Sequence, residues 1–274
     1  MMFKPLLYLI IALCILVYTK SSDNAASYSP PPDVHKLLNI SEKFTYEVRY
    51  GFFNLGTVTI SILSDTTYRG EPAHYLFYHV KSNPIPLIGH KERNYHTFMA
   101  HNDTTFYGLK FWTDSVHDDM YGDQVYDFDY QKGKVYTFEE DDDHVITRDT
   151  LELNELADSG PVIFYFSRLH AGTNRKVNYP VYISHEKGNV MLQNYDEIIS
   201  YSSGAFPGGD VDAYKTIGNA DVDGPFGFSG RIEAIYKADE LRIPLEARIK
   251  VWLGNVRVRL TDYEIENERT ETMP

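Results

Sequence analysis

The residues best suited to chemistry in this chain are acidic and histidine side chains in two short stretches. Glu139–His144 is a run of five acids and a histidine, and carboxylate oxygens are the ligands that calcium prefers. The run lacks the alternating spacing and central glycine of a calcium loop. Asp114–Asp119 surrounds His117 with carboxylates but offers no second pair at the spacing of transition-metal ligands. We predict solvated loops at both places, and neither a metal site nor a cofactor.

Nucleophilic and acid–base catalysis receive equally little support. Ser229 lies in a Gly-Phe-Ser-Gly stretch that is similar to a nucleophile elbow, but Arg231 stands where the second glycine belongs. No Ser-His-Asp arrangement can be assembled, and no carboxylate pair stands out for glycoside hydrolysis. Four histidines fall on or near expected strands, where a hydrogen-bonded structural role is common: His74, His79, His90 and His96. We predict no catalytic residue.

The aromatic residues are better candidates for ligand binding, because the chain has 22 tyrosines and 15 phenylalanines. Those in its middle part exceed what a tight core readily packs, so some are expected to line a cavity for an acyl chain or to stack on a sugar. The alternative is a large aromatic core with tyrosines on the outer face. The predicted ligand-binding residues are Tyr75, Phe77, Phe98, Phe106, Trp112, Tyr126 and Phe128.

Charge limits the partners. The net charge of -13 argues against nucleic acid, which requires a basic surface. A cationic stripe nevertheless follows the last strands: Arg248, Lys250, Arg257 and Arg259. It could meet an anionic lipid or glycan, but in so acidic a chain we expect it to pair with Glu233 and Glu246.

The N-terminus predicts export. Residues 1–26 combine Lys4, a short apolar run and small residues, which is the pattern of a signal peptide. An uncleaved anchor is the alternative; lipidation of Cys14, the only cysteine, is disfavoured because Leu13 precedes it. Residues 27–40 contain three consecutive prolines and are expected to form a flexible leader.

Apolar residues alternate with polar ones in many short segments, which predicts antiparallel strands. The clearest case is the stretch 241–263, a hairpin with an apolar and a cationic face and a turn at Gly254–Asn255. A second hairpin is expected over residues 44–62, a further turn at Glu186–Asn189 and a projecting loop at Tyr201–Asp210. The spacing is typical of a sandwich or barrel.

One segment departs from this period. Residues 158–170 carry a capping residue in Ser159, a proline in the first turn, and Arg168 and His170 near the end, with Gly172 just beyond. Few polar side chains lie between, so we predict a mostly buried helix that plugs or caps the sheet.

These landmarks resemble a known family. Phe44–Gly51 with Leu55–Ile60 is similar to the opening of the exported bacterial domain-of-unknown-function 3108 family. Asp239–Leu245 and the hairpin after it resemble its closing section, and Asp158, Arg168 and Gly172 its central landmark. The resemblance covers residues 41–264 and implies a periplasmic or cell-envelope β protein. It carries over no catalytic residue.

We therefore predict an all-β chain: an antiparallel barrel or strongly curved sheet over residues 41–265, with one central helix at about 160–170 and a polar tail at 266–274. The leading hypothesis is non-catalytic binding of an apolar or amphiphilic envelope molecule, such as a lipid or glycan, by a protein at most peripheral to the membrane. The alternatives are a polysaccharide-acting hydrolase and a structural protein-interaction module.

Overall fold

The computed structural model describes residues 30–84, 92–115, 123–140, 144–224, 228–251 and 254–268. The predicted signal peptide, His90, His117 and the tail beyond residue 268 lie outside these ranges, as does the side chain of Ser229. The helices and strands are α2 (Val34–Leu38), β1 (Ile40–Tyr50), β2 (Phe53–Tyr68), β3 (Glu71–Ser82), β4 (Glu92–His101), β5 (Phe106–Ser115), β6 (Gln124–Asp129), β7 (Lys134–Glu140), β8 (Ile146–Glu152), α3 (Ile163–Arg168), β9 (Lys176–Ile183), β10 (Glu186–Asn194), β11 (Ile199–Ser202), β12 (Asp210–Gly224), β13 (Phe228–Lys237), β14 (Pro244–Val251) and β15 (Gly254–Glu268).

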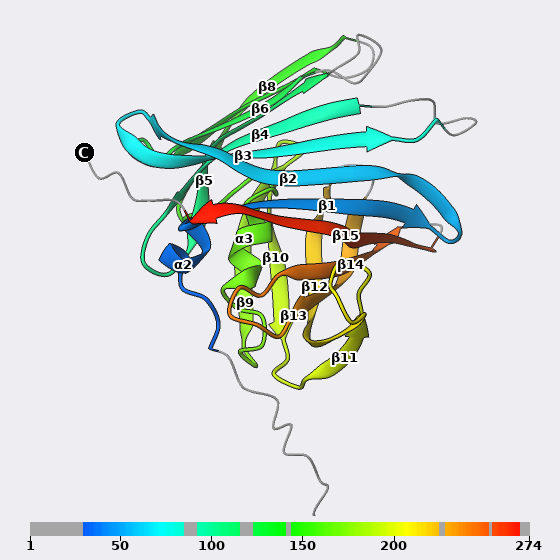
Figure 1. Ribbon diagram of the computed structural model, residues 1–274. Helices are drawn as coiled ribbons and strands as arrows, with labels where there is room; N and C mark the ends of the chain where they lie inside the picture. The colour runs from blue at the N-terminus through cyan, green and yellow to red at the C-terminus, as the bar shows by residue number, and fades with distance from the viewer. Residues whose placement is uncertain are drawn as a thin grey trace, which may run out of the picture.

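The described strands form one antiparallel sheet that curls around α3 (Figure 1). Its order is β8-β7-β6-β5-β4-β3-β2-β1-β15-β14-β13-β12-β10-β9, with β11 attached to β12. The first and last strands of the chain therefore meet in the middle, where β1 pairs with β15. The edges β8 and β9 do not pair with each other, so the sheet is strongly curved but not closed into a barrel. This confirms the predicted fold class.

The C-terminal hairpin has the two faces that its sequence predicts. Ala247 lies opposite Val258 and Ile249 opposite Val256, while Arg248 lies opposite Arg257 on the other face. The predicted turn at Gly254–Asn255 is wrong, because both residues belong to β15, where they pair with Val251 and Lys250 of β14. Gly254 instead has a φ of 137° within β15, and a Cβ there would lie 3.5 Å from the Tyr50 ring.

The predicted turn at Glu186–Asn189 is also displaced. The reversal occurs at Ser184 and His185, whose φ angles of 52° and 60° place both in the left-handed region of a type I′ hairpin turn. Gly188 lies inside β10, and a Cβ there would lie 2.0 Å from Cγ1 of Val222 on the neighbouring segment. This glycine therefore permits close packing rather than a turn.

The central helix α3 lies on the concave side of the sheet (Figure 1). It is shorter than predicted, at six residues, and buries Tyr165, Phe166 and Arg168. The predicted cap Ser159 is wrong. The carboxylate of Asp158 accepts the backbone N–H groups of Gly160 and Val162 at 2.8 and 2.7 Å, because it precedes the turn by the right spacing.

The folded part begins earlier than residue 41. Val34, Leu37 and Leu38 of α2, which fall in the predicted leader, are buried in the main core. Asp33 caps this helix by accepting the Lys36 N–H at 2.7 Å. Within the described part of the chain, no helix is both long and apolar enough to span a membrane.

Candidate binding site beneath the central helix

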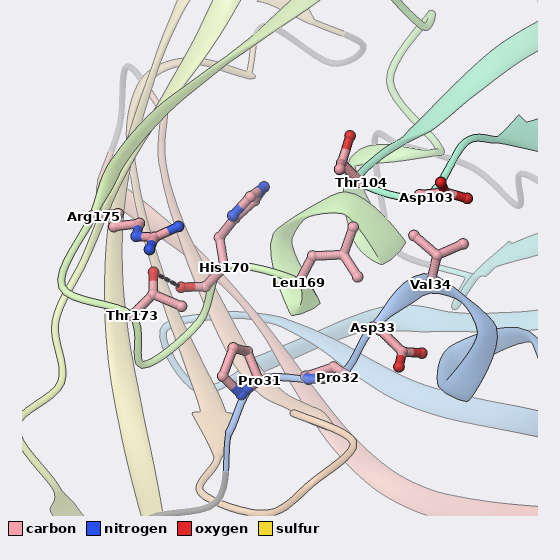
Figure 2. A pocket seen from close by; sticks show the side chains of 10 residues that line it. All are labelled: Pro31, Pro32, Asp33, Val34, Asp103, Thr104, Leu169, His170, Thr173 and Arg175. Carbon is pink, nitrogen blue, oxygen red and sulfur yellow. Dashed lines mark hydrogen bonds between the residues drawn. The ribbon is translucent and has the colours of Figure 1, made fainter.

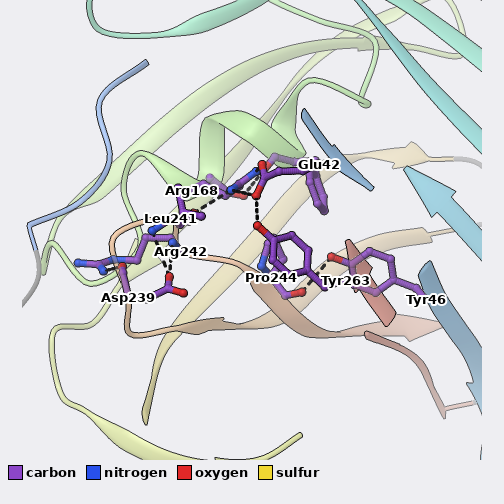
Figure 3. A network of polar contacts seen from close by, with 10 residues as sticks. Glu42, Tyr46, Arg168, Asp239, Leu241, Arg242, Pro244 and Tyr263 are labelled. Carbon is purple, nitrogen blue, oxygen red and sulfur yellow. Dashed lines mark hydrogen bonds and ion pairs between the residues drawn. The ribbon is translucent and has the colours of Figure 1, made fainter. Parts of the chain in front are cut away.

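A buried ion pair holds the C-terminal end of α3 against the centre of the sheet (Figure 3). The guanidinium of Arg168 donates to both carboxylate oxygens of Glu42, at 2.8 and 3.0 Å, and both side chains are essentially fully buried. The hydroxyl of Tyr263 donates to the same carboxylate at 2.5 Å, and Nε of Arg168 donates to the carbonyl of Leu241 at 2.9 Å. The helix is thereby fixed to β1, β15 and the segment before β14.

The charges of Arg168 and Glu42 stabilise each other. Burial by itself lowers the pKa of Arg168, but the adjacent Glu42 carboxylate outweighs it and raises the pKa above its ordinary value. The guanidinium also lies 5.4 Å from the ring centre of Phe44 and 5.3 Å from that of Tyr165. Because the two charges satisfy each other, their burial is compatible with an apolar surrounding.

A short segment that contains Ala157 and Asp158, which we call the strap, fixes the N-terminal end of α3. Asp158 forms a parallel bridge to Val181 at the β9 edge, while the carbonyl of Ala157 accepts the N–H of Gly108 in β5 at 2.8 Å. A Cβ at Gly108 would lie 2.7 Å from Oδ1 of Asp158, so a glycine is required for this approach. Burial raises the pKa of Asp158 to about 6. The strap covers the β9 edge and connects it to β5.

An apolar cavity of about 280 Å³ lies between α3 and the concave face of the sheet. Its walls come from α3 and the turn before it and from strands on both sides of the β1–β15 junction. Residues that line it include Tyr46, Ile60, Tyr78, Phe164, Ile232, Ala234, Ala247 and Val258. Small side chains at Ala234, Ala247 and Gly218 leave this space unfilled, since the register places Ala234 opposite Ala247.

The polar groups of the cavity wall are bound to the protein itself. The hydroxyl of Tyr46 donates to the Pro244 carbonyl at 2.9 Å, and that of Tyr78 donates to the Pro161 carbonyl at 2.6 Å. Burial raises the pKa of both phenols well above the ordinary value, so they stay neutral. The carboxylate of Glu246 is bound by Tyr201 at 2.8 Å and Arg248 at 2.6 Å. The cavity is therefore suited to hydrocarbon rather than to a polar group.

The sequence predicted the apolar faces of these strands but not the cavity. Tyr46, Ile60 and Val258 follow the period-two pattern, whereas the volume left free depends on where α3 rests. A strand pattern shows which face is apolar, and it contains no signal for how closely the opposite wall approaches.

A second pocket, of about 420 Å³, lies at the end of α3 beside the N-terminal segment (Figure 2). His170 and Arg175 stand on one side of it, and Asp33 and Asp103 on the other. Burial, with a smaller contribution from Arg175, lowers the pKa of His170 to about 4, so its ring is neutral. The Asp33 carboxylate is already used as the cap of α2. The pocket thus has mixed charge and a less defined chemical character than the apolar cavity.

The seven predicted ligand-binding aromatics are divided between the two faces of the sheet, and none is among the residues that line either pocket. Four of them form an aromatic cluster on β3, β4 and β5, in which Tyr75, Phe77 and Trp112 contact the ring of His96 and Phe98 contacts that of Trp112. The Trp112 and His96 ring centres are 4.9 Å apart and nearly parallel. Because these rings stack against each other, their faces are largely occupied, and whether they bind a ligand stays a prediction.

The other three aromatics belong to the buried core. Phe106 is fully buried and makes an edge contact with Tyr165 of α3. Tyr126 and Phe128 pack with Tyr182 in a smaller core cluster between β6 and β9. Tyr126 also donates a hydrogen bond to Glu139, one of the residues of the acidic run.

The described histidines of the sequence prediction each have a side-chain partner. His74 contacts Asp65 at 2.7 Å, His79 contacts Asn94 at 2.9 Å, and His96 contacts Tyr75 at 2.6 Å. Within the described ranges, no group of three histidine, cysteine or acidic residues is arranged to hold a metal ion. The cationic stripe pairs in part as predicted, since Arg248 and Arg257 lie 2.6 and 3.6 Å from Glu246.

Comparison with known proteins agrees with this architecture. One solved structure, described as a β-barrel-like protein of the domain of unknown function DUF1849 from Brucella abortus, matches with a TM-score of 0.53 and 10% identity. The match covers 83% of this chain and 98% of that one, and it shows a shared fold. No curated protein matches the chain. The model of the family "Protein of unknown function (DUF3108)" matches residues 45–261. The chain therefore belongs to the DUF3108 family.

Proposed function

We propose that the protein binds the hydrocarbon part of an envelope molecule, such as the alkyl chain of a lipid, in the cavity beneath α3. The observation that carries this proposal is the combination of an apolar wall with polar groups already bound within the protein. A ligand head group would find no free partner there and would stay outside. The apolar N-terminal segment supports an exported location.

The size of the cavity limits the ligand. At ~30 Å³ for a group the size of a water molecule, 280 Å³ takes about nine such groups. This is near the lower end of ligand pockets, which measure roughly 300–1,000 Å³. We therefore expect one alkyl chain of medium length to be preferred over longer or paired chains.

Isothermal titration calorimetry with decanoate tests the proposal, because the alkyl chain beyond its carboxylate matches the size of the cavity while the carboxylate stays outside. We expect Ala234→Phe, which fills the cavity, to weaken binding at least about tenfold, the loss of ~1.4 kcal/mol or more. The matched control Thr57→Phe adds the same side chain at an exposed position of β2 and should bind as the original protein does. Circular dichroism checks that both variants fold.

A third variant separates the cavity from the outer aromatic cluster. Trp112→Ala removes the largest ring of that cluster without touching the cavity wall. If Trp112→Ala abolishes binding while Ala234→Phe does not, the cavity is not the site and the aromatic residues predicted from the sequence are.

The buried carboxylates give the hydrolase alternative no support. Each of the four described ones serves a different structural partner: Glu42 binds Arg168, Asp129 binds Lys132, Asp158 binds backbone N–H groups of the turn before α3, and Glu246 binds Tyr201. A hydrolase of polysaccharides instead needs two such groups facing one cleft.

The interaction-module alternative has one feature in its favour. Strand β8 is an edge of the sheet and most of its residues are exposed, so its free backbone groups could pair with a strand of another protein. Its charged side chains Arg148, Asp149 and Glu152 are typical of edges that avoid such pairing.

A further inference from the structure

The tip of the β1–β2 hairpin exposes two adjacent phenylalanines. Phe52 is 82% exposed and Phe53 53%, and their ring centres are 4.1 Å apart. Exposing large aromatic side chains to water is unfavourable, and such a pair at a hairpin tip is typical of a contact surface. We call these two residues the phenylalanine tip.

A row of three arginines crosses the sheet just behind this tip. In the register, Arg49 of β1 lies opposite Arg257 of β15, which lies opposite Arg248 of β14. Side chains at opposite positions share a face, and like charges placed so are destabilising. We call these residues the arginine row; each is about half exposed.

The acidic neighbours balance this row only in part. Glu47 pairs with Arg49 at 2.7 Å, while Glu246 serves both Arg248 and Arg257. Within the described part of the chain, all three contacts use Nε, which leaves the terminal guanidinium nitrogens for an external anion. Lys250, two residues after Arg248 in β14, is exposed and has no described ion pair. A local excess of positive charge on a chain of net charge -13 points to an anionic partner.

We propose that the phenylalanine tip and the arginine row dock the protein on an anionic lipid surface. The end of β1 next to the phenylalanine tip lies beside the start of β15, since Tyr50 pairs with Val256 (Figure 1). Phenylalanines enter the boundary between head groups and acyl chains, while arginines just behind them meet the phosphates. A soluble polyanion would use the cations but would leave the phenylalanines in water, so the combination favours a membrane.

Co-sedimentation with vesicles tests this surface. We expect binding to vesicles of phosphatidylglycerol and phosphatidylcholine, no binding to phosphatidylcholine alone, and a loss of binding at high salt. Arg49→Gln and Arg257→Gln should each weaken binding about fivefold, which corresponds to ~1 kcal/mol for each cation near an anionic surface. Phe52→Ser should also weaken it without affecting the fold, given its exposure.

Matched controls lie far from the tip. Ile265→Ser removes an apolar side chain that is 55% exposed near the far end of β15, and Lys176→Gln removes an exposed cation at the start of β9. Both should bind vesicles as the original protein does. The cavity variant Ala234→Phe should also bind vesicles normally, so this proposal and the proposed function can fail separately.

Three results would overturn the docking proposal. These are an absence of binding to anionic vesicles, equal binding to vesicles of phosphatidylcholine alone, and binding that Phe52→Ser leaves unchanged. In the last case, equal binding of soluble dextran sulfate would show that the arginine row recognises a polyanion rather than a membrane.

Discussion

The buried Arg168–Glu42 pair allows a quantitative prediction about stability. Replacing Arg168 by methionine leaves the Glu42 carboxylate buried with the Tyr263 hydroxyl as its remaining described side-chain partner. Breaking such a pair by removing one charge typically costs about 3–5 kcal/mol. For a domain of this size, ~1 kcal/mol corresponds to about 2–4 °C in the melting temperature, so we expect a decrease of about 6–20 °C.

A double-mutant cycle identifies the origin of this loss. Glu42→Leu combined with Arg168→Met replaces both charges by apolar groups, and such replacements of buried pairs are often neutral or stabilising. We therefore expect the double variant to be more stable than either single variant. Thermal unfolding followed by far-ultraviolet circular dichroism measures all four proteins, and urea titration provides the free energies.

An exposed ion pair serves as the control. Lys36 and Glu240 are also in contact, at 2.5 Å, but both side chains are substantially exposed. Lys36→Met should therefore cost no more than ~1 kcal/mol. If Arg168→Met costs as little, or if the losses of Arg168→Met and Glu42→Leu simply add, the ion pair does not fix α3 to the sheet.

Three further predictions concern buried groups near α3. Burial raises the pKa of Asp158 from 3.8 to about 6, so between these pH values the native state retains a proton that the unfolded chain has lost. The free energy of unfolding should therefore fall by about 3 kcal/mol as the pH rises from about 4 to above 6. Urea titrations of Asp158→Asn at several pH values should lack this decrease. Burial lowers the pKa of His170 to about 4, so the contribution of its neutral ring to stability is present above about pH 6.5 and lost as the pH falls towards 4. His170→Gln should reduce this loss of stability in acid. If the free energy of unfolding depends on pH in the same way in the variant, the burial of His170 is not the cause. Gly172→Ala should destabilise the protein by at least about 1–2 kcal/mol, because Gly172 has a φ of 77° and a Cβ there would lie 2.8 Å from the Tyr214 ring. Gly204→Ala, with open space around it, should cost less in the same thermal unfolding assay.

The sequence by itself determined the strands, their faces and the class of fold. Alternating apolar residues such as Ala247, Ile249, Val256 and Val258 share a face in the structure, because a strand has a strict period of two. The helix signals around Arg168 also predicted a buried helix at the right place. These features depend on residues close together in the chain, and local patterns therefore contain them.

Only the tertiary structure decided the cavity, the turns and the partners of the buried charges. Glu42 and Arg168 are 126 residues apart, and no local pattern indicates that they meet. Gly188 suggested a turn, but in the structure it allows β10 to approach Val222 closely. The predicted aromatics divided between core and outer face because register and curvature determine which rings meet. The free space beneath α3 likewise results from how far a helix fixed at both ends stands from the sheet, which is a property of long-range contacts.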